Sequence, residues 1–84
     1  MRPRTLLKRI LVAPHNVRFR DLLGLAKAFG FRVERTEGSH HILIHPDIPE
    51  LLNLQEVKGE VKPYQVKQLL RLLERHNLTL REDA

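Results

Sequence analysis

The sequence has no cysteine and no tryptophan. Without cysteine, disulfide bonds and thiol chemistry are excluded, and so is a small secreted fold held together by disulfides. The sequence also lacks any apolar run near the roughly 20 residues that a membrane-spanning helix needs. Its amino-terminal apolar segment, Thr5 to Ala13, is interrupted by Lys8 and Arg9. We therefore expect an intracellular, cytoplasmic protein without a membrane span.

Acidic residues are missing from the first 20 positions, whereas basic residues are frequent there. These basic residues are Arg2, Arg4, Lys8, Arg9, Arg18 and Arg20. The whole chain of 84 residues has a net charge of +5 and an isoelectric point near 10.2. Such a balance favours a polyanionic partner such as RNA, although some basic proteins have no such partner. The length predicts a single domain, residues 1–84.

Apolar residues recur at helical spacing in three segments. The first predicts a short amphipathic helix at residues 4–13, and the second predicts a helix from Arg18 to Phe29 that Gly30 ends. The third begins at Pro63, a residue that suits the first turn of a helix, and continues to about His76. Its solvated side carries a basic stripe formed by Lys67, Arg71 and Arg75.

Between the second and third helices lie three segments with strand patterns, at residues 31–35, 40–45 and 51–55. Turn-forming residues separate them at 37–39 and 46–49. The predicted order is α-α-β-β-β-α. We expect an α+β fold of two layers, in which helices cover one face of a three-stranded antiparallel sheet and the opposite face is open.

Histidine is concentrated in the second strand, at His40, His41 and His45. A metal site is not expected, because His41 and His45 are about 13 Å apart along a strand and His40 points to the other face. Zinc needs further ligands that the sequence does not place nearby. Ser39 lies in no nucleophile motif and is interpreted as a turn residue. We predict neither a metal nor another cofactor.

Acid–base cleavage of RNA needs fewer protein groups than a metal site or a nucleophilic enzyme, because RNA supplies its own nucleophile, the 2′-hydroxyl group. A histidine that titrates near neutral pH can move the proton, and basic side chains can hold the phosphate. One exposed histidine on a basic surface is therefore sufficient for a ribonuclease hypothesis. A histidine that is only a strand residue remains the alternative.

The chain contains a characteristic succession of elements and short motifs. In order, these are a helix, Gly30-Phe31, a short strand, Gly38-Ser39-His40-His41, an apolar strand and His45-Pro46. This succession resembles the HicA family of bacterial toxins, most clearly from Phe19 to Pro46. The resemblance implies a fold like that of double-stranded-RNA-binding domains, with a HicA-like core at about residues 18–78. It also implies a metal-independent mRNA interferase of a type II toxin–antitoxin pair, which cuts mRNA and is neutralised by the antitoxin HicB.

The family's catalytic histidine follows directly after Gly-Ser or Gly-Thr, so the resemblance assigns this role to His40. The later half departs from the family pattern, which has Pro-x-His after the third strand and Gly-Thr-Leu at the start of the last helix. This chain has Leu51-Leu52-Asn53-Leu54-Gln55 and Lys62-Pro63-Tyr64-Gln65-Val66 instead. Together with the extra helix at 4–13, these differences indicate a variant subgroup.

The predicted RNA contacts lie beside His40 and at the entrance of the last helix. Lys62 and Lys67 are expected to bind phosphates, as the last helix does in double-stranded-RNA-binding domains, and Tyr64 to stack on a base. The complete set is Arg35, Gly38, Ser39, His41, Lys62, Tyr64 and Lys67. A solvated helix face for the lysines, and a place at the edge of the core for Tyr64, remain the alternatives.

Strand alternation leaves the exposure of His40 open. His40 shares a face with Ile42 and Ile44, whereas His41 shares the other face with Leu43 and His45. If the isoleucines face the core, His40 points inward unless it lies at the strand start or a bulge at Gly38-Ser39 turns it outward. If neither holds, His41 is the exposed candidate.

Three functions therefore remain open. The first is the mRNA-cleaving toxin, and the second is a non-catalytic RNA-binding module. The third is a partner-binding protein or homodimer that uses the amphipathic first helix. An exposed His40 favours the first, a buried His40 the second, and a detached first helix the third.

Overall fold

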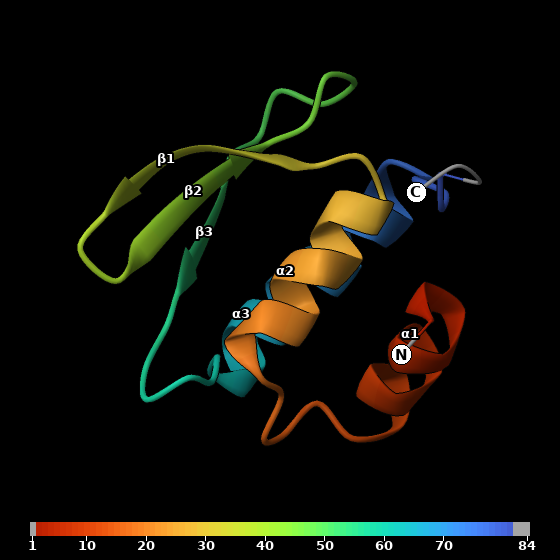
Figure 1. Cartoon of the computed structure of the whole chain (residues 1–84). Helices are drawn as coiled ribbons and strands as arrows, with labels where there is room; N and C mark the ends of the chain where they lie inside the picture. Colours follow the sequence, from red (N-terminus) through yellow and green to blue (C-terminus); the bar gives the residue numbers. More distant parts are fainter. Residues whose placement is uncertain (1, 82–84) are drawn as a thin grey trace.

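The computed structural model describes residues 2–81, and within them it has three helices and three strands (Figure 1). In chain order these are α1 (Pro3–Val12), α2 (Phe19–Ala28), β1 (Arg32–Glu37), β2 (His40–Ile44), β3 (Leu52–Gln55) and α3 (Pro63–Arg75). The predicted α+β fold and its element order are confirmed. Most boundaries agree with the sequence patterns within one residue, but β1 continues two residues beyond the predicted end at Arg35.

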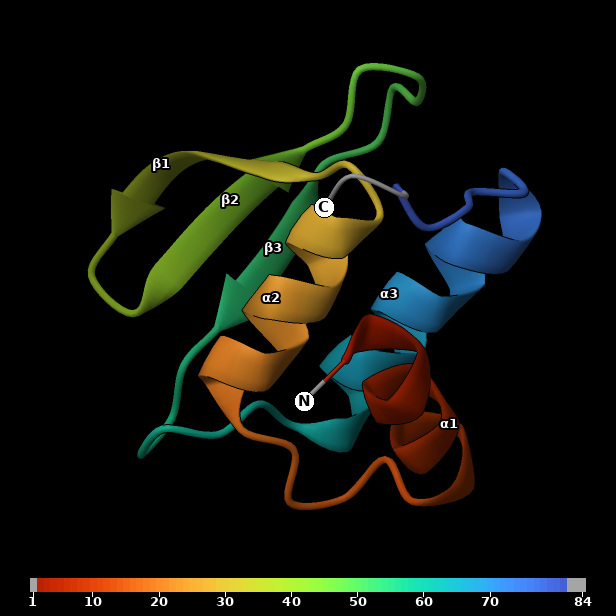
Figure 2. The same ribbon diagram turned by 45° about the vertical axis from the view of Figure 1, so that its right-hand side comes forward.

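The strands form one antiparallel sheet in the order β1-β2-β3. Figures 1 and 2 show α2 and α3 on the same side of this sheet, whereas α1 lies beside the two helices and away from the strands. One face of the sheet is therefore covered by helices, and the other is open. Strand side chains alternate between these two environments.

The core lies between the sheet and the helices, because each element contributes its apolar side there. Its fully buried large side chains are Ile10, Leu22, Leu25, Leu43, Leu52, Leu54, Val66 and Leu69. Burial of one such side chain stabilises the fold by about 1.5–3 kcal/mol relative to an exposed position. The helical spacing of the leucines in α2 and α3 and the alternation of Leu52 and Leu54 in β3 thus direct these elements onto each other.

Gly30 ends α2, as its sequence position predicts. Its φ of +104° is in the left-handed region, and the amide of Phe31 donates to the carbonyl of Ala26, 3.0 Å away. A Cβ atom at Gly30 would lie 2.8 Å from Nε2 of His45. The position therefore needs glycine both for its backbone conformation and for the close approach of His45, the buried residue that follows β2.

The extra helix α1 is packed onto the domain. Leu6 and Ile10 are buried, with Ile10 only 2% exposed, and Leu7 is partly buried. Leu11, which lies four residues after Leu7 and so has the spacing of the same helical face, is nevertheless 61% exposed. A detached first helix was the feature expected of a partner-binding protein, and this packing does not support that reading.

Residue Glu34 forms a bulge in β1 that the sequence pattern did not predict. Val33 pairs with Leu43 and Arg35 pairs with Ile42, so that one extra residue lies between them in β1. Beyond the bulge, the alternation of β1 is shifted by one residue. Arg35 and Glu37 consequently face the open side of the sheet, the same side as His40.

Candidate functional site

The turn between β1 and β2 consists of Gly38 and Ser39. Gly38 has a φ of +59°, whereas Ser39 has no positive φ, which matches the two-residue hairpin turn that places glycine first. A Cβ at Gly38 would meet nothing within 4 Å, so glycine serves the backbone conformation there. The tight turn fixes the strand register and places Glu37 directly opposite His40.

His40 is exposed on the open face at the start of β2. The side of the strand that faces the helices carries Leu43, with no exposed surface, and then His45. Ile42 and Ile44 lie on the open face and are half-buried. The condition under which His40 would point inward is therefore not met, and neither a bulge at Gly38-Ser39 nor a special position is needed to expose it.

The ring of His40 is held by a neighbour from β3. Its Nδ1 atom lies 3.1 Å from Oδ1 of Asn53, which sits diagonally across from it, because Asn53 is paired with Ile42 and Gln55 with His40. Gln55 in turn donates from Nε2 to Oγ of Ser39, 3.4 Å away. The other ring nitrogen of His40, Nε2, takes no part in the bond to Asn53.

Arg35 shares the open face with His40 but is engaged in an ion pair. Its Nε atom lies 3.0 Å from Oε1 of Glu37, and the two side chains are 59% and 67% exposed. Exposed pairs of this kind are worth about 0–1 kcal/mol. A phosphate can therefore replace Glu37 as the partner of Arg35 at little cost.

His41 faces the helices. Its ring packs on Phe19 with centroids 4.4 Å apart, Nδ1 lies 3.4 Å from Oγ1 of Thr36, and Nε2 lies 3.8 Å from Oε1 of Glu56. The side chain is 18% exposed. The structure thus separates His41 from His40 by the thickness of the sheet.

His45 is buried and its two ring nitrogens are both used. Nε2 lies 2.9 Å from the carbonyl oxygen of Phe29 and must donate to it, while Nδ1 accepts from the amide of Asp47 at 3.0 Å. The ring also meets the edge of Phe31. This arrangement connects the end of β2 to the end of α2. His45 therefore has a structural role, at a position away from the hairpin.

The predicted contacts on α3 belong to the helical layer. Lys62, Tyr64 and Lys67 are all exposed at the start of this helix, Tyr64 by 58%. Arg35, Gly38, Ser39 and His40 instead gather at the hairpin. The predicted residues therefore form two groups, one at the β1–β2 hairpin and one at the entrance of α3.

Gln65 and Asn53 are parts of the site that the sequence analysis missed. Gln65 is 4% exposed; its Oε1 accepts from the amide of Gln55 at 3.0 Å, and its Nε2 donates to the carbonyl of Asn53 at 3.3 Å. A glutamine four residues before Leu69, on the buried stripe of a helix, was a signal for such a satisfied buried amide. No comparable signal marks Asn53, because its position depends on the strand register.

Other polar clusters lie away from the hairpin. Oε1 of Glu50 lies 2.9 Å from Nε2 of His76, and Oε2 of Glu50 forms an ion pair with Arg75 at 3.1 Å. The hydrogen bond from His76, assisted by that from Arg75, holds the pKa of Glu50 below its ordinary value of 4.5 against the opposing effect of burial. Within residues 2–81, no group of three or more His, Asp or Glu side chains is arranged to hold a metal ion.

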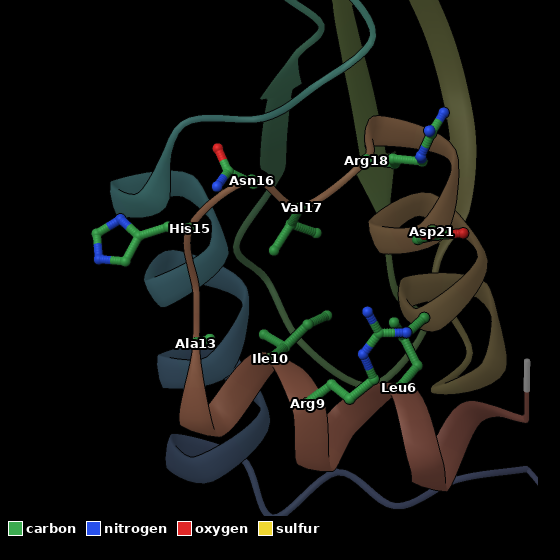
Figure 3. A pocket seen from close by; sticks show the side chains of 9 residues that line it. All are labelled: Leu6, Arg9, Ile10, Ala13, His15, Asn16, Val17, Arg18 and Asp21. Carbon is green, nitrogen blue, oxygen red and sulfur yellow. The ribbon is translucent and has the colours of Figure 1, made fainter.

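A hollow of about 250 Å³ opens between α1 and the segment that leads into α2 (Figure 3). Figure 3 shows Arg9 directed into it and His15 directed away from it. None of the residues that line it belongs to the sheet. The hollow is therefore separate from the hairpin that carries His40.

The fold and the hairpin define a small α+β domain with an exposed histidine after a Gly-Ser turn. Residues 19–74, which begin with α2 and include the sheet and nearly all of α3, match the family model described as the HicA toxin of bacterial toxin–antitoxin systems. The match covers more than half of the chain, and the chain therefore belongs to the HicA toxin family. The resemblance seen in the sequence is confirmed. Helix α1 lies outside the matched region.

Membership in this family makes the chain the toxin component of a pair that works with an antitoxin. No curated protein and no solved structure matches the chain. In the described part of the chain, residues 2–81, every helix is too short or too polar to span a membrane.

Proposed function

We propose that this toxin is an endoribonuclease that cuts mRNA without a metal ion, with His40 as the general acid and base. The observation that carries the proposal is the position of His40, exposed on the open face with Nδ1 held by Asn53 at 3.1 Å. A histidine fixed through one nitrogen presents the other to a substrate in a defined direction. A HicB-like antitoxin is the proposed neutralising partner.

The reaction uses the 2′-hydroxyl group of the RNA as its nucleophile. Nε2 of His40 takes the 2′-hydroxyl proton while the 2′-oxygen forms a bond to the adjacent phosphorus. The bond between phosphorus and the 5′-oxygen of the next nucleotide breaks, and that oxygen receives the proton from Nε2. The products are a 2′,3′-cyclic phosphate and a 5′-hydroxyl end, and the histidine returns to its starting state.

Charge at the hairpin supports binding of the phosphate. Arg35 is on the open face beside His40, and its ion pair with Glu37 is exposed and readily exchanged. The exposed backbone of Gly38 and Ser39 offers amide donors at the tip. In the proposal, Arg35 binds the reacting phosphate and Ser39 lies beside it.

The group at the entrance of α3 is proposed to bind RNA farther along the strand. Lys62 and Lys67 carry exposed charge suited to phosphates, and exposed Tyr64 offers a ring on which a base can stack. His41 is also predicted to contact RNA, through the 18% of its side chain that is exposed.

The test uses purified protein, a long single-stranded RNA and excess EDTA. The expected result is cleavage that leaves 2′,3′-cyclic phosphate or 3′-phosphate ends, together with 5′-hydroxyl ends, on analysis of the fragments by mass spectrometry. A matched substrate with 2′-deoxyribose at the cleaved positions should stay intact there. Cleavage of the deoxy positions, or fragments with 5′-phosphate ends, would overturn the proposed chemistry.

Binding without cleavage would support the second candidate, a non-catalytic RNA-binding module. The acidic Glu37 opposite His40 is the observation that favours it, because its carboxylate opposes a reacting phosphate at His40 but not RNA contacts at the entrance of α3. Electrophoretic mobility shifts at several salt concentrations on the same RNA separate the two functions.

A further inference from the structure

We infer that Asn53 is a positioning residue that holds His40 in one tautomer, with the proton on Nδ1 and the lone pair on Nε2. The effect of this tautomer on catalysis rests on the proposed function. The tautomer itself does not, and it can be measured whether or not the protein cuts RNA.

The contact fixes the direction of the hydrogen bond. Oδ1 of an asparagine side chain can only accept, and it lies 3.1 Å from Nδ1 of His40. Nδ1 must therefore carry a hydrogen for the bond to form. In a neutral imidazole only one nitrogen is protonated, so Nε2 becomes the acceptor and can serve as the base.

The backbone of Asn53 is itself held in place. Strand β3 is at the edge of the sheet, where strand backbone groups are without a neighbouring strand. The buried side chain of Gln65 takes the position of such a neighbour, since it donates to the carbonyl of Asn53 and accepts from the amide of Gln55. Leu52 and Leu54 on either side have no exposed surface.

The support thus runs from α3 through β3 to the histidine. Gln65 holds the free edge of the strand, the two leucines pack on its covered side, and Asn53 projects to the open side, where its carboxamide meets His40. Because the backbone of Asn53 is already ordered, the hydrogen bond to His40 has to order only the side-chain torsions of Asn53. Asn53 is therefore a residue whose backbone is held by the surrounding structure, and its contact with His40 depends on that support.

The protein contains its own reference for the measurement. His45 donates from Nε2 to the carbonyl of Phe29 and accepts at Nδ1 from the amide of Asp47. Its neutral ring must therefore carry the hydrogen on Nε2, the reverse of what we infer for His40. Both tautomers should appear in one spectrum.

The experiment is a long-range ¹H–¹⁵N NMR spectrum of the ¹⁵N-labelled full chain at mildly alkaline pH, where imidazole rings are neutral. We expect the Nδ1–H pattern for His40 and the Nε2–H pattern for His45. In Asn53→Ala the His40 pattern should change toward Nε2–H or a mixture, whereas Asn53→Asp, which keeps an acceptor oxygen, should preserve Nδ1–H. Gln55→Ala is the matched control, because Gln55 lies on the same strand face and bonds to Ser39 instead.

Kinetics add a second readout if the parent cuts RNA. Asn53→Ala should lower kcat by about 10–100-fold, less than the 10²–10⁴-fold that a general acid or base supplies, with KM changed less than twofold. Asn53→Asp should retain the kcat of the pH-independent plateau, whereas the acid limb of its pH–rate profile should move to higher pH because a carboxylate favours the protonated ring.

An Nε2–H pattern for His40 in the parent would overturn the inference, since Asn53 would then present its NH₂ group to the ring. An unchanged Nδ1–H pattern in a folded Asn53→Ala variant would overturn it as well. A parent that shows the expected tautomers but leaves RNA intact would contradict the proposed ribonuclease and uphold the role of Asn53 in holding the ring. The two claims therefore fail separately.

Discussion

The imidazole of His41 lies on the phenyl ring of Phe19, with the ring centroids 4.4 Å apart and the planes tilted by 40°. Its neighbour His40 projects from the opposite face of the sheet, toward solvent. Adjacent strand residues face opposite sides of a sheet, and here these sides are the helix-covered interior and the open surface. Two consecutive histidines consequently have different environments.

This separation predicts different effects on stability. His41→Ala should lower the free energy of unfolding by about 1–2 kcal/mol, because it removes the ring contact with Phe19 and leaves the space of the imidazole empty. His40→Ala should change it by about 0.5 kcal/mol or less, as at other exposed positions. Urea unfolding followed by circular dichroism measures both. Equal losses for the two variants would contradict the assignment of faces.

The ion pair of Glu37 with Arg35 predicts that Glu37 weakens RNA binding. Glu37→Gln should raise RNA affinity about two- to fivefold, because it releases Arg35 from a pair worth about 0.2–1 kcal/mol and removes a negative charge beside His40. Glu34→Gln is the control, because it changes the net charge equally from the bulge of the same strand. Fluorescence anisotropy with a labelled RNA measures the affinities. An equal gain in both variants would point to net charge alone.

Glu50 predicts a defined pH dependence of stability. Its folded-state pKa lies below 4.5, chiefly because of the hydrogen bond from His76. The contribution of Glu50 is therefore present above the unfolded-state pKa and is lost as the pH falls through the folded-state pKa. The difference in urea midpoint between the parent and Glu50→Gln should thus be largest near neutral pH and shrink below about pH 4.

The control for this measurement is Glu74→Gln, on the exposed side of α3. Its midpoint should follow that of the parent across the same pH range. A gap between the parent and Glu50→Gln that stays constant from pH 7 to pH 3 would show that the carboxylate contributes through its shape and not through its charge.

The packing of helix α1 predicts that substitutions at two neighbouring residues differ in their effect on stability. Ile10→Ala should cost about 2–4 kcal/mol of stability, because Ile10 is 2% exposed and its removal leaves a cavity. Leu11→Ala should cost little, because Leu11 is 61% exposed. Thermal unfolding of both variants measures the contrast. A loss confined to Leu11→Ala, accompanied by a change in oligomeric state on size-exclusion chromatography, would instead make α1 an interface between copies.

Much of this fold could be predicted from the periodicity of apolar residues. Helical spacing located all three helices, and strand patterns bounded by turn-forming residues located the three strands within about two residues. The two faces of β2 could not be assigned in the same way, because Ile42, Leu43 and Ile44 are apolar without interruption. Which of them faces the core depends on the volume between sheet and helices, and that is a property of the whole packing.

The site was predictable only in part. Gly38 and Ser39 form the expected turn, and the family pattern pointed to His40. The bulge at Glu34 depends on strand register, which neither β1 nor β2 specifies alone. Asn53 reaches His40 only because β3 pairs with β2 in one particular register.

The central claim is that His40 moves the proton in a metal-independent cleavage of RNA. Its most direct test is the single-turnover cleavage rate of a long single-stranded RNA in EDTA, measured for the parent and for His40→Ala. His15→Ala, at an exposed position outside the helices and strands, controls for loss of a histidine. We predict cleavage by the parent and by His15→Ala, and a loss of about 10²-fold or more for a folded His40→Ala protein. Equal rates for parent and His40→Ala would contradict the assignment of His40, and no cleavage by the parent would contradict the ribonuclease itself.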